Sequence, residues 1–137
     1  FLDGPEEYLR FLQAVDRKAA GVHLDICNNM NSPRRFYENT AYIRHTFQLL
    51  KDEIVSLHLK DIALKPDALT VVFEEVPIGM GGMDYVTLME EISRLPADKP
   101  AILEHLQTEA EYDLAAEAAE AFARKAGMHK EGPVWVR

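Results

Sequence analysis

The sequence has 137 residues, of which 47% are hydrophobic and 28% are charged, a composition typical of one globular domain. Its formal net charge of −8 argues against a nucleic-acid partner, because phosphate binding draws on Lys and Arg. The single cysteine, Cys27, excludes an internal disulfide and suits a reducing compartment. No apolar run has the length that a bilayer span needs, so we expect a cytoplasmic protein that does not bind membranes.

The first half of the chain is expected to form two helices and two strands. Apolar residues recur on one face over residues 5–19, which predicts a helix. An alternating strand follows over residues 22–27. Ser32 caps a long helix that is predicted over residues 33–53, and the second strand covers residues 54–60.

The next stretch, residues 61–82, is rich in glycine toward its end and is expected to be irregular. Residues 69–74 are the one segment in it that we expect to pair, as an arm of a hairpin. Asp84 is predicted to cap a helix that runs to residue 95. A third strand is predicted over residues 101–106.

The last predicted element is an Ala-rich helix. It starts at a capping box formed by Thr108 and Glu111 and ends at Gly127, while residues 128–137 are left unassigned. The order of elements is therefore one helix followed by three βα units. Such alternation implies parallel strands joined by right-handed helical crossovers, and we predict an α/β protein without a second domain.

The three predicted strands carry polar side chains on the face opposite their apolar residues. Alternation places four of them on that face, in the C-terminal halves of their strands: Asp25, His58, Lys60 and Glu104. Parallel α/β folds bind ligands at this end, and carboxylates with an imidazole suit Mn²⁺, Mg²⁺, Co²⁺ or Zn²⁺. The alternative is a salt-bridged or hydrogen-bonded polar face that holds no metal.

Other reactive side chains are given smaller roles. His23 faces inward below Asp25, and we expect it either to orient that carboxylate or to be a satisfied interior histidine. Cys27 is interpreted as a small packing residue rather than a nucleophile. No role is assigned to the histidines that show no convergence with the predicted site, namely His45, His105 and His129.

Four stretches resemble the xylose isomerase-like barrel superfamily, which includes ketose 3-epimerases, hydroxypyruvate isomerases, inosose dehydratases and endonuclease IV. They are Val22–Asn28, Ser56–Asp61, Pro77–Asp84 and Ala101–His105. The resemblance implies that residues 1–137 are a single C-terminal segment of a (β/α)₈ TIM barrel, its last three βα units preceded by the fifth helix. Because Phe1 is not an initiator Met and opens onto a helix, we expect the N-terminal strands to be missing.

In that family an Asp, a His and two Glu hold one divalent ion. The resemblance assigns three of these ligands to Asp25, His58 and Glu104, and places the fourth, a fifth-strand Glu, before residue 1. It makes Glu104 one of two catalytic bases in a reaction whose enediolate the metal would stabilise. Asn28 stands where ketose epimerases and endonuclease IV carry a His, and we expect Asn28 and Lys60 to contact the substrate.

The resemblance therefore implies a divalent-metal-dependent isomerase or epimerase that acts on a small sugar or sugar phosphate. A polyol-ketone dehydratase of the inosose type is the nearest alternative, since the same metal and base could expel a β-hydroxyl. Endonuclease IV needs an Asp-x-His where Asp84 is followed here by Tyr85 and Val86, so the DNA-repair activity is disfavoured.

Three strands cannot close a barrel, so we expect catalysis from the complete barrel and not from this chain alone. The chain then either needs its N-terminal half or pairs with another copy, as a homo-oligomer, or with another subunit. In the second case it would be a non-catalytic half-barrel.

Overall fold

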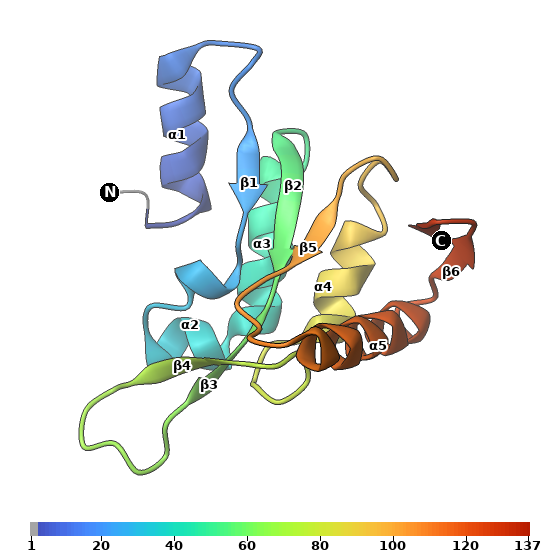
Figure 1. Ribbon diagram of the computed structural model, residues 1–137. Helices are drawn as coiled ribbons and strands as arrows, with labels where there is room; N and C mark the ends of the chain where they lie inside the picture. The colour runs from blue at the N-terminus through green and yellow to red at the C-terminus, as the bar shows by residue number, and fades with distance from the viewer. Residues whose placement is uncertain (1–2) are drawn as a thin grey trace.

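A computed structural model describes residues 3–137 of the chain (Figure 1). Its helical elements are α1 (Pro5–Val15), the 3₁₀ turn η1 (Cys27–Asn29), α2 (Pro33–Tyr37), α3 (Asn39–Leu50), α4 (Tyr85–Ile92) and α5 (Glu109–Lys125). Its strands are β1 (Val22–Leu24), β2 (Ile54–Leu59), β3 (Asp61–Leu64), β4 (Phe73–Val76), β5 (Ala101–Leu103), β6 (His129–Glu131) and β7 (Val134–Val136). None of these helices has the length and apolar character that crossing a membrane requires.

The central sheet has three parallel strands in the order β1-β2-β5. His23 pairs with Ser56 between β1 and β2, and His58 pairs with Ile102 between β2 and β5. This arrangement confirms the predicted α/β class and the parallel βα units. Within residues 3–137 no further strand joins either edge of this sheet, so the described part of the chain does not close a barrel.

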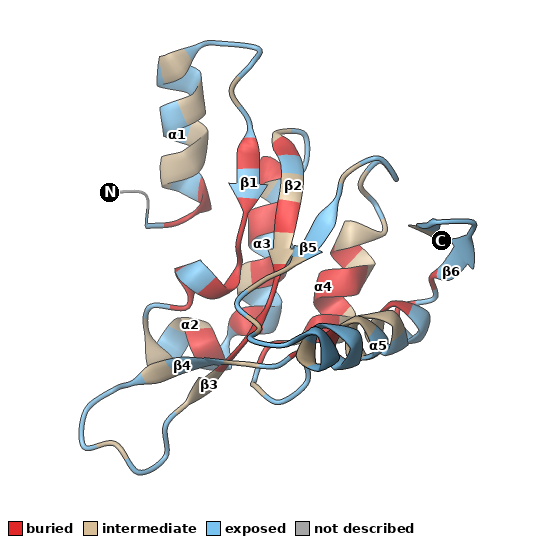
Figure 2. Cartoon of the chain, viewed as in Figure 1, coloured by how far each residue is buried: buried red, intermediate tan, exposed pale blue. Residues whose placement is uncertain are grey.

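Buried side chains concentrate where β1 and β2 pack against α3 and α4 (Figure 2). Ile43, Phe47 and Leu50 on α3 are at most 2% exposed, and they share one core with Ile54 and Leu57 of β2. Burying each such side chain stabilises the fold by about 1.5–3 kcal/mol. The helices thus cover one face of the sheet, which leaves the other face for polar side chains.

Two helices are shorter than predicted. α1 ends before its predicted limit, because Asp16 adopts a left-handed φ of 45°. The single helix predicted over residues 33–53 divides into α2 and α3 at Glu38, just before Asn39. The Asn39 side-chain amide donates to the carbonyl oxygens of Phe36 at 2.6 Å and Gly82 at 2.9 Å, which fixes the break against a distant loop.

The first strand is shorter than predicted because Asp25 turns the chain. Its Oδ1 accepts the backbone N–H of Asn28 at 3.1 Å, and its carbonyl accepts the side-chain amide of Asn29 at 3.1 Å. Hydrogen bonds of an Asp side chain to backbone two or three residues later favour turns over strands. Cys27 therefore lies in η1 rather than in the strand.

The stretch predicted to be irregular contains an antiparallel hairpin instead. β3 pairs with β4, with Ile62 opposite Glu75 and Leu64 opposite Phe73. The predicted arm, residues 69–74, overlaps β4 only at its end. The hairpin continues from the C-terminal end of β2 and projects away from the sheet and its helices (Figure 1).

The C-terminal third follows the predicted order. β5 is shorter than expected, and the capping box is confirmed, since Thr108 Oγ1 accepts the Glu111 N–H at 3.3 Å and Glu111 Oε2 accepts the Thr108 N–H at 2.9 Å. Asp84 caps α4 as predicted, with Oδ1 accepting the Thr87 N–H at 3.0 Å. The unassigned tail forms a second antiparallel hairpin from β6 and β7.

The carboxylate of Asp61 holds the glycine-rich loop after β4. Asp61 is 1% exposed, and its two oxygens accept four backbone N–H groups, those of Ile62, Gly79, Gly81 and Met83. Burial raises the pKa of Asp61, and the four N–H groups offset this only in part. A Cβ on Gly81 would lie 2.3 Å from Asp61 Oδ1, so the loop fits around the buried anion only with glycine there.

We expect Asp61→Asn to lower the free energy of unfolding by about 2–4 kcal/mol, because one amide NH₂ would face backbone N–H donors that are left without an acceptor. Urea unfolding followed by circular dichroism measures the change. Asp67→Asn is the control, since Asp67 is exposed, and it should shift stability by less than about 0.5 kcal/mol. Equal effects of the two substitutions would contradict this role of Asp61.

Candidate metal centre

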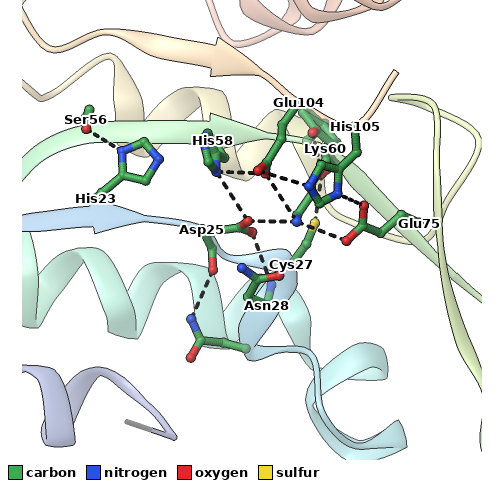
Figure 3. A network of polar contacts seen from close by, with 12 residues as sticks. His23, Asp25, Cys27, Asn28, Ser56, His58, Lys60, Glu75, Glu104 and His105 are labelled. Atoms are coloured by element: carbon green, nitrogen blue, oxygen red, sulfur yellow. Dashed lines mark hydrogen bonds and ion pairs between the residues drawn. The ribbon is translucent and has the colours of Figure 1, made fainter. Parts of the chain in front are cut away.

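Asp25, His58 and Glu104 converge at the C-terminal ends of the three parallel strands (Figure 3). Asp25 follows β1, His58 lies near the end of β2, and Glu104 follows β5. One ligand atom from each lies within 4.8 Å of the other two. His58 Nδ1 is 2.7 Å from Glu104 Oε2 and 3.6 Å from Asp25 Oδ2. The sequence prediction that these residues share one site is thus consistent with their positions in the fold.

The ammonium group of Lys60 lies among three carboxylates. Nζ is 3.0 Å from Asp25 Oδ2, 3.0 Å from Glu75 Oε1 and 3.3 Å from Glu104 Oε2, and the side chain is 4% exposed. Burial opposes this charge, but the contacts with Asp25 and Glu75 outweigh it and raise the pKa of Lys60 above its ordinary value. Three carboxylates against one ammonium leave two formal negative charges, the amount that one divalent cation balances.

Two carboxylate oxygens at this site fit the requirements of a metal ligand. Asp25 Oδ2 and Glu104 Oε2 are buried and accept no hydrogen bond. Lys60 and His58 come within ion-pair distance of both oxygens, but not in hydrogen-bonding directions. Buried polar atoms are rarely left in this state in native proteins, and binding of an ion is one of the recognised explanations.

Glu75 and His105 also reach this site, although no pattern in the sequence indicated them. His105 Nδ1 contacts Glu75 Oε2, and His105 Nε2 lies 3.1 Å from Glu104 Oε1. Burial raises the pKa of Glu75, but the contacts with His105 and Lys60 outweigh it and bring that pKa below its usual range. The expectation that His105 does not converge with the site was therefore wrong.

Of the two alternatives for His23, the described residues show no hydrogen bond to Asp25 but do show a hydrogen-bonded ring, although the side chain is exposed. Its Nδ1 contacts Ser56 Oγ, and its ring packs edge-on against the ring of His58, with centroids 4.0 Å apart. It therefore supports the His58 side of the cluster rather than Asp25. Asn28, a predicted substrate contact, is exposed, and its backbone N–H rather than its side chain bonds Asp25.

Two hydrogen bonds hold the backbone carbonyl of Lys60. Its oxygen accepts one from the thiol of Cys27 at 2.8 Å and one from the hydroxyl of Tyr85 at 2.7 Å. Burial raises the pKa of the Cys27 thiol, which disfavours the reactive thiolate and supports the expected packing role. Lys60 also borders a pocket of about 120 Å³, whose polar lining consists of Lys60, Glu75, Glu104, His105, Gln107 and Glu111.

Comparison with known proteins identifies the fold family. A family model described as "Xylose isomerase-like TIM barrel" matches residues 1–125 of the sequence. The chain belongs to this family. A search among curated proteins found no significant match.

A solved xylose isomerase-like TIM barrel protein from Mycobacterium smegmatis, in complex with magnesium, is similar in structure with a TM-score of 0.60 and 17% sequence identity. The match covers 90% of this chain and 39% of that chain. This xylose isomerase-like chain therefore spans about two fifths of that protein, and at this identity the likeness concerns the fold alone. The predicted family and partial-barrel fold are confirmed.

In this xylose isomerase-like chain, we expect Lys60→Met to lower the free energy of unfolding by about 2–4 kcal/mol, because it leaves three carboxylates without their buried counter-charge. Urea unfolding in the presence of a chelator measures the change. Lys65→Met is the matched control, since Lys65 forms an exposed pair with Glu74, and its cost should not exceed about 1 kcal/mol. A Lys60→Met protein as stable as the control would show that the cluster does not depend on this cation.

Proposed function

We propose that this chain contributes Asp25, His58 and Glu104 as three ligands of one divalent-metal centre in a sugar isomerase or epimerase. The observation that carries the proposal is the convergence of their ligand atoms within 4.8 Å, two of these side chains having a buried oxygen without a hydrogen bond. Family membership supports the reaction class, and the Mycobacterium smegmatis relative was solved in complex with magnesium. Carboxylates and an imidazole suit Mg²⁺, Mn²⁺, Co²⁺ or Zn²⁺.

The spacing of the donor atoms supports the same conclusion. Adjacent ligands of an octahedral ion at about 2.1 Å lie about 3 Å from each other. His58 Nδ1 is 2.7 Å from one carboxylate oxygen of the cluster and 3.6 Å from another, values on either side of that distance. The His58 nitrogen is therefore spaced to share one cation with either carboxylate.

The proposed reaction is proton transfer next to a carbonyl through an enediolate. When bound, the metal would polarise the carbonyl and a neighbouring hydroxyl of an open-chain sugar, which favours loss of the C–H proton from the carbon that bears that hydroxyl. Glu104 is the proposed base, since its carboxylate borders the pocket at the end of β5. Asn28 is proposed to bond a sugar hydroxyl with its exposed amide, and Lys60 to reach the substrate through the pocket that it lines.

The catalytic proposal concerns a complete barrel, because the chain spans only part of the length of its structural relative. We propose that residues 1–137 are a single C-terminal segment of that barrel. β1 and β5 form the edges of the described sheet, and Ile102 on the face opposite the helices is 46% exposed. Strands from the N-terminal half of a longer chain, or from another copy, would cover this face and complete the wall.

Calorimetric titration with Mn²⁺ tests the metal centre in this chain. We expect the unsubstituted chain to bind one ion and His58→Ala to bind at least about 100-fold more weakly, since it removes a ligand rather than an outer contact. His129→Ala is the matched control, because His129 is exposed on β6 and its one ion pair among the described residues is with Glu131. Binding that is equal in the two variants, or absent from the unsubstituted chain, would refute the proposal.

A further inference from the structure

His105 and Glu75 lie beside Glu104 without belonging to the three proposed ligands (Figure 3). His105 Nε2 is 3.1 Å from Glu104 Oε1, while His105 Nδ1 contacts Glu75 Oε2. Glu75 is held in turn by Lys60, whose Nζ donates to Glu75 Oε1 at 3.0 Å. The imidazole therefore lies between two carboxylates, hydrogen-bonded to Glu75 of the hairpin and within ion-pair distance of Glu104 at the end of β5.

We propose that His105, oriented by Glu75, positions the Glu104 carboxylate and thereby strengthens metal binding, an inference that rests on the proposed function. The contact at Glu104 Oε1 holds one oxygen of the carboxylate, and the other, Oε2, then faces His58 Nδ1 at 2.7 Å. Outer contacts of this kind orient ligands and commonly change metal affinity by about 10–100-fold. Glu75 and His105 are thus positioning residues, one acting through the other on Glu104.

The backbone at His105 supports this role independently. Its φ is 61°, a left-handed conformation that L-residues other than Asn, Asp and His seldom adopt. Among the described residues, five have a positive φ, and three of those five are glycines. Position 105 keeps a bulky imidazole in this conformation directly after a proposed ligand. Residues held in such sparsely populated backbone regions cluster at active sites and ligand clamps.

The left-handed conformation also explains how His105 reaches the site. In a continuous extended strand, neighbouring side chains point to opposite faces, so residue 105 would point away from Glu104. β5 ends at Leu103, and the turn at His105 brings its ring to the same side as the Glu104 carboxylate. The left-handed backbone at His105 thus allows its imidazole to contact the Glu104 carboxylate.

A purely structural role for His105 would be to connect the hairpin to the end of β5, and two substitutions separate the two roles. The amide nitrogen of His105→Asn replaces Nδ1, next to Glu75, and asparagine tolerates a left-handed backbone. The amide nitrogen of His105→Gln replaces Nε2, next to Glu104, but glutamine tolerates that backbone less well. The first variant therefore keeps stability and loses the contact to Glu104, and the second does the reverse.

The test combines Mn²⁺ calorimetry with urea unfolding for the full chain and these variants. We expect His105→Asn to be at least as stable as the unsubstituted chain and to bind Mn²⁺ about tenfold more weakly. His105→Gln should be less stable, yet bind Mn²⁺ within about threefold of the unsubstituted chain. Glu75→Gln keeps an acceptor for His105 but loses the charge, so its affinity should fall between these two.

Mn²⁺ affinity that is unchanged in His105→Asn would overturn the positioning role and leave the metal centre intact. A loss of affinity that follows the loss of stability, greater in His105→Gln than in His105→Asn, would overturn it as well. Absence of Mn²⁺ binding in the unsubstituted chain would refute the proposed function together with this inference. The three results differ from one another and from the expected one.

Discussion

The position of one ammonium group, that of Lys60, determines how the polar ends of this fold meet. Carboxylates from the ends of β1, β4 and β5 approach within 3.3 Å of its Nζ, and without a cation their repulsion would oppose that approach. Lys60 follows the central strand, β2, so it can reach the acids on both sides. The central strand thus supplies the charge that allows its neighbours to place acidic groups close together.

Much of this arrangement could be predicted from the sequence. A period-two pattern decides which side chains of a strand share a face, and the apolar residues of β2 allow only one face to meet the helices. The convergence of Asp25, His58 and Glu104 follows from that pattern once the strands are parallel and adjacent. Helix starts were also predictable at Ser32 and Asp84, because capping depends on a few consecutive residues.

The parts that were missed depend on contacts between distant segments or on single backbone angles. Glu75 joins the site through an antiparallel hairpin. The position of that hairpin depends on the hydrogen bonds that Asp61 accepts from the loop after it. His105 joins through a left-handed turn that no periodicity reveals. The break between α2 and α3 similarly depends on a hydrogen bond from Asn39 to the carbonyl of Gly82, which lies far away in sequence. Local pattern therefore accounted for the frame of the site and not for the side chains around it.

Lys60 and Asp61 are consecutive residues in opposite surroundings. The ammonium of Lys60 faces three carboxylates, and the carboxylate of Asp61 faces four backbone N–H donors. Deleting one residue just before this pair would place Asp61 at the position of Lys60, and inserting one would place Lys60 at the position of Asp61, because a one-residue slip moves every side chain to the other face. The deletion would add a fourth anion to the acidic cluster, and the insertion would set a cation against the N–H donors. The length of the chain between β2 and the hairpin is consequently constrained together with the identity of the two residues.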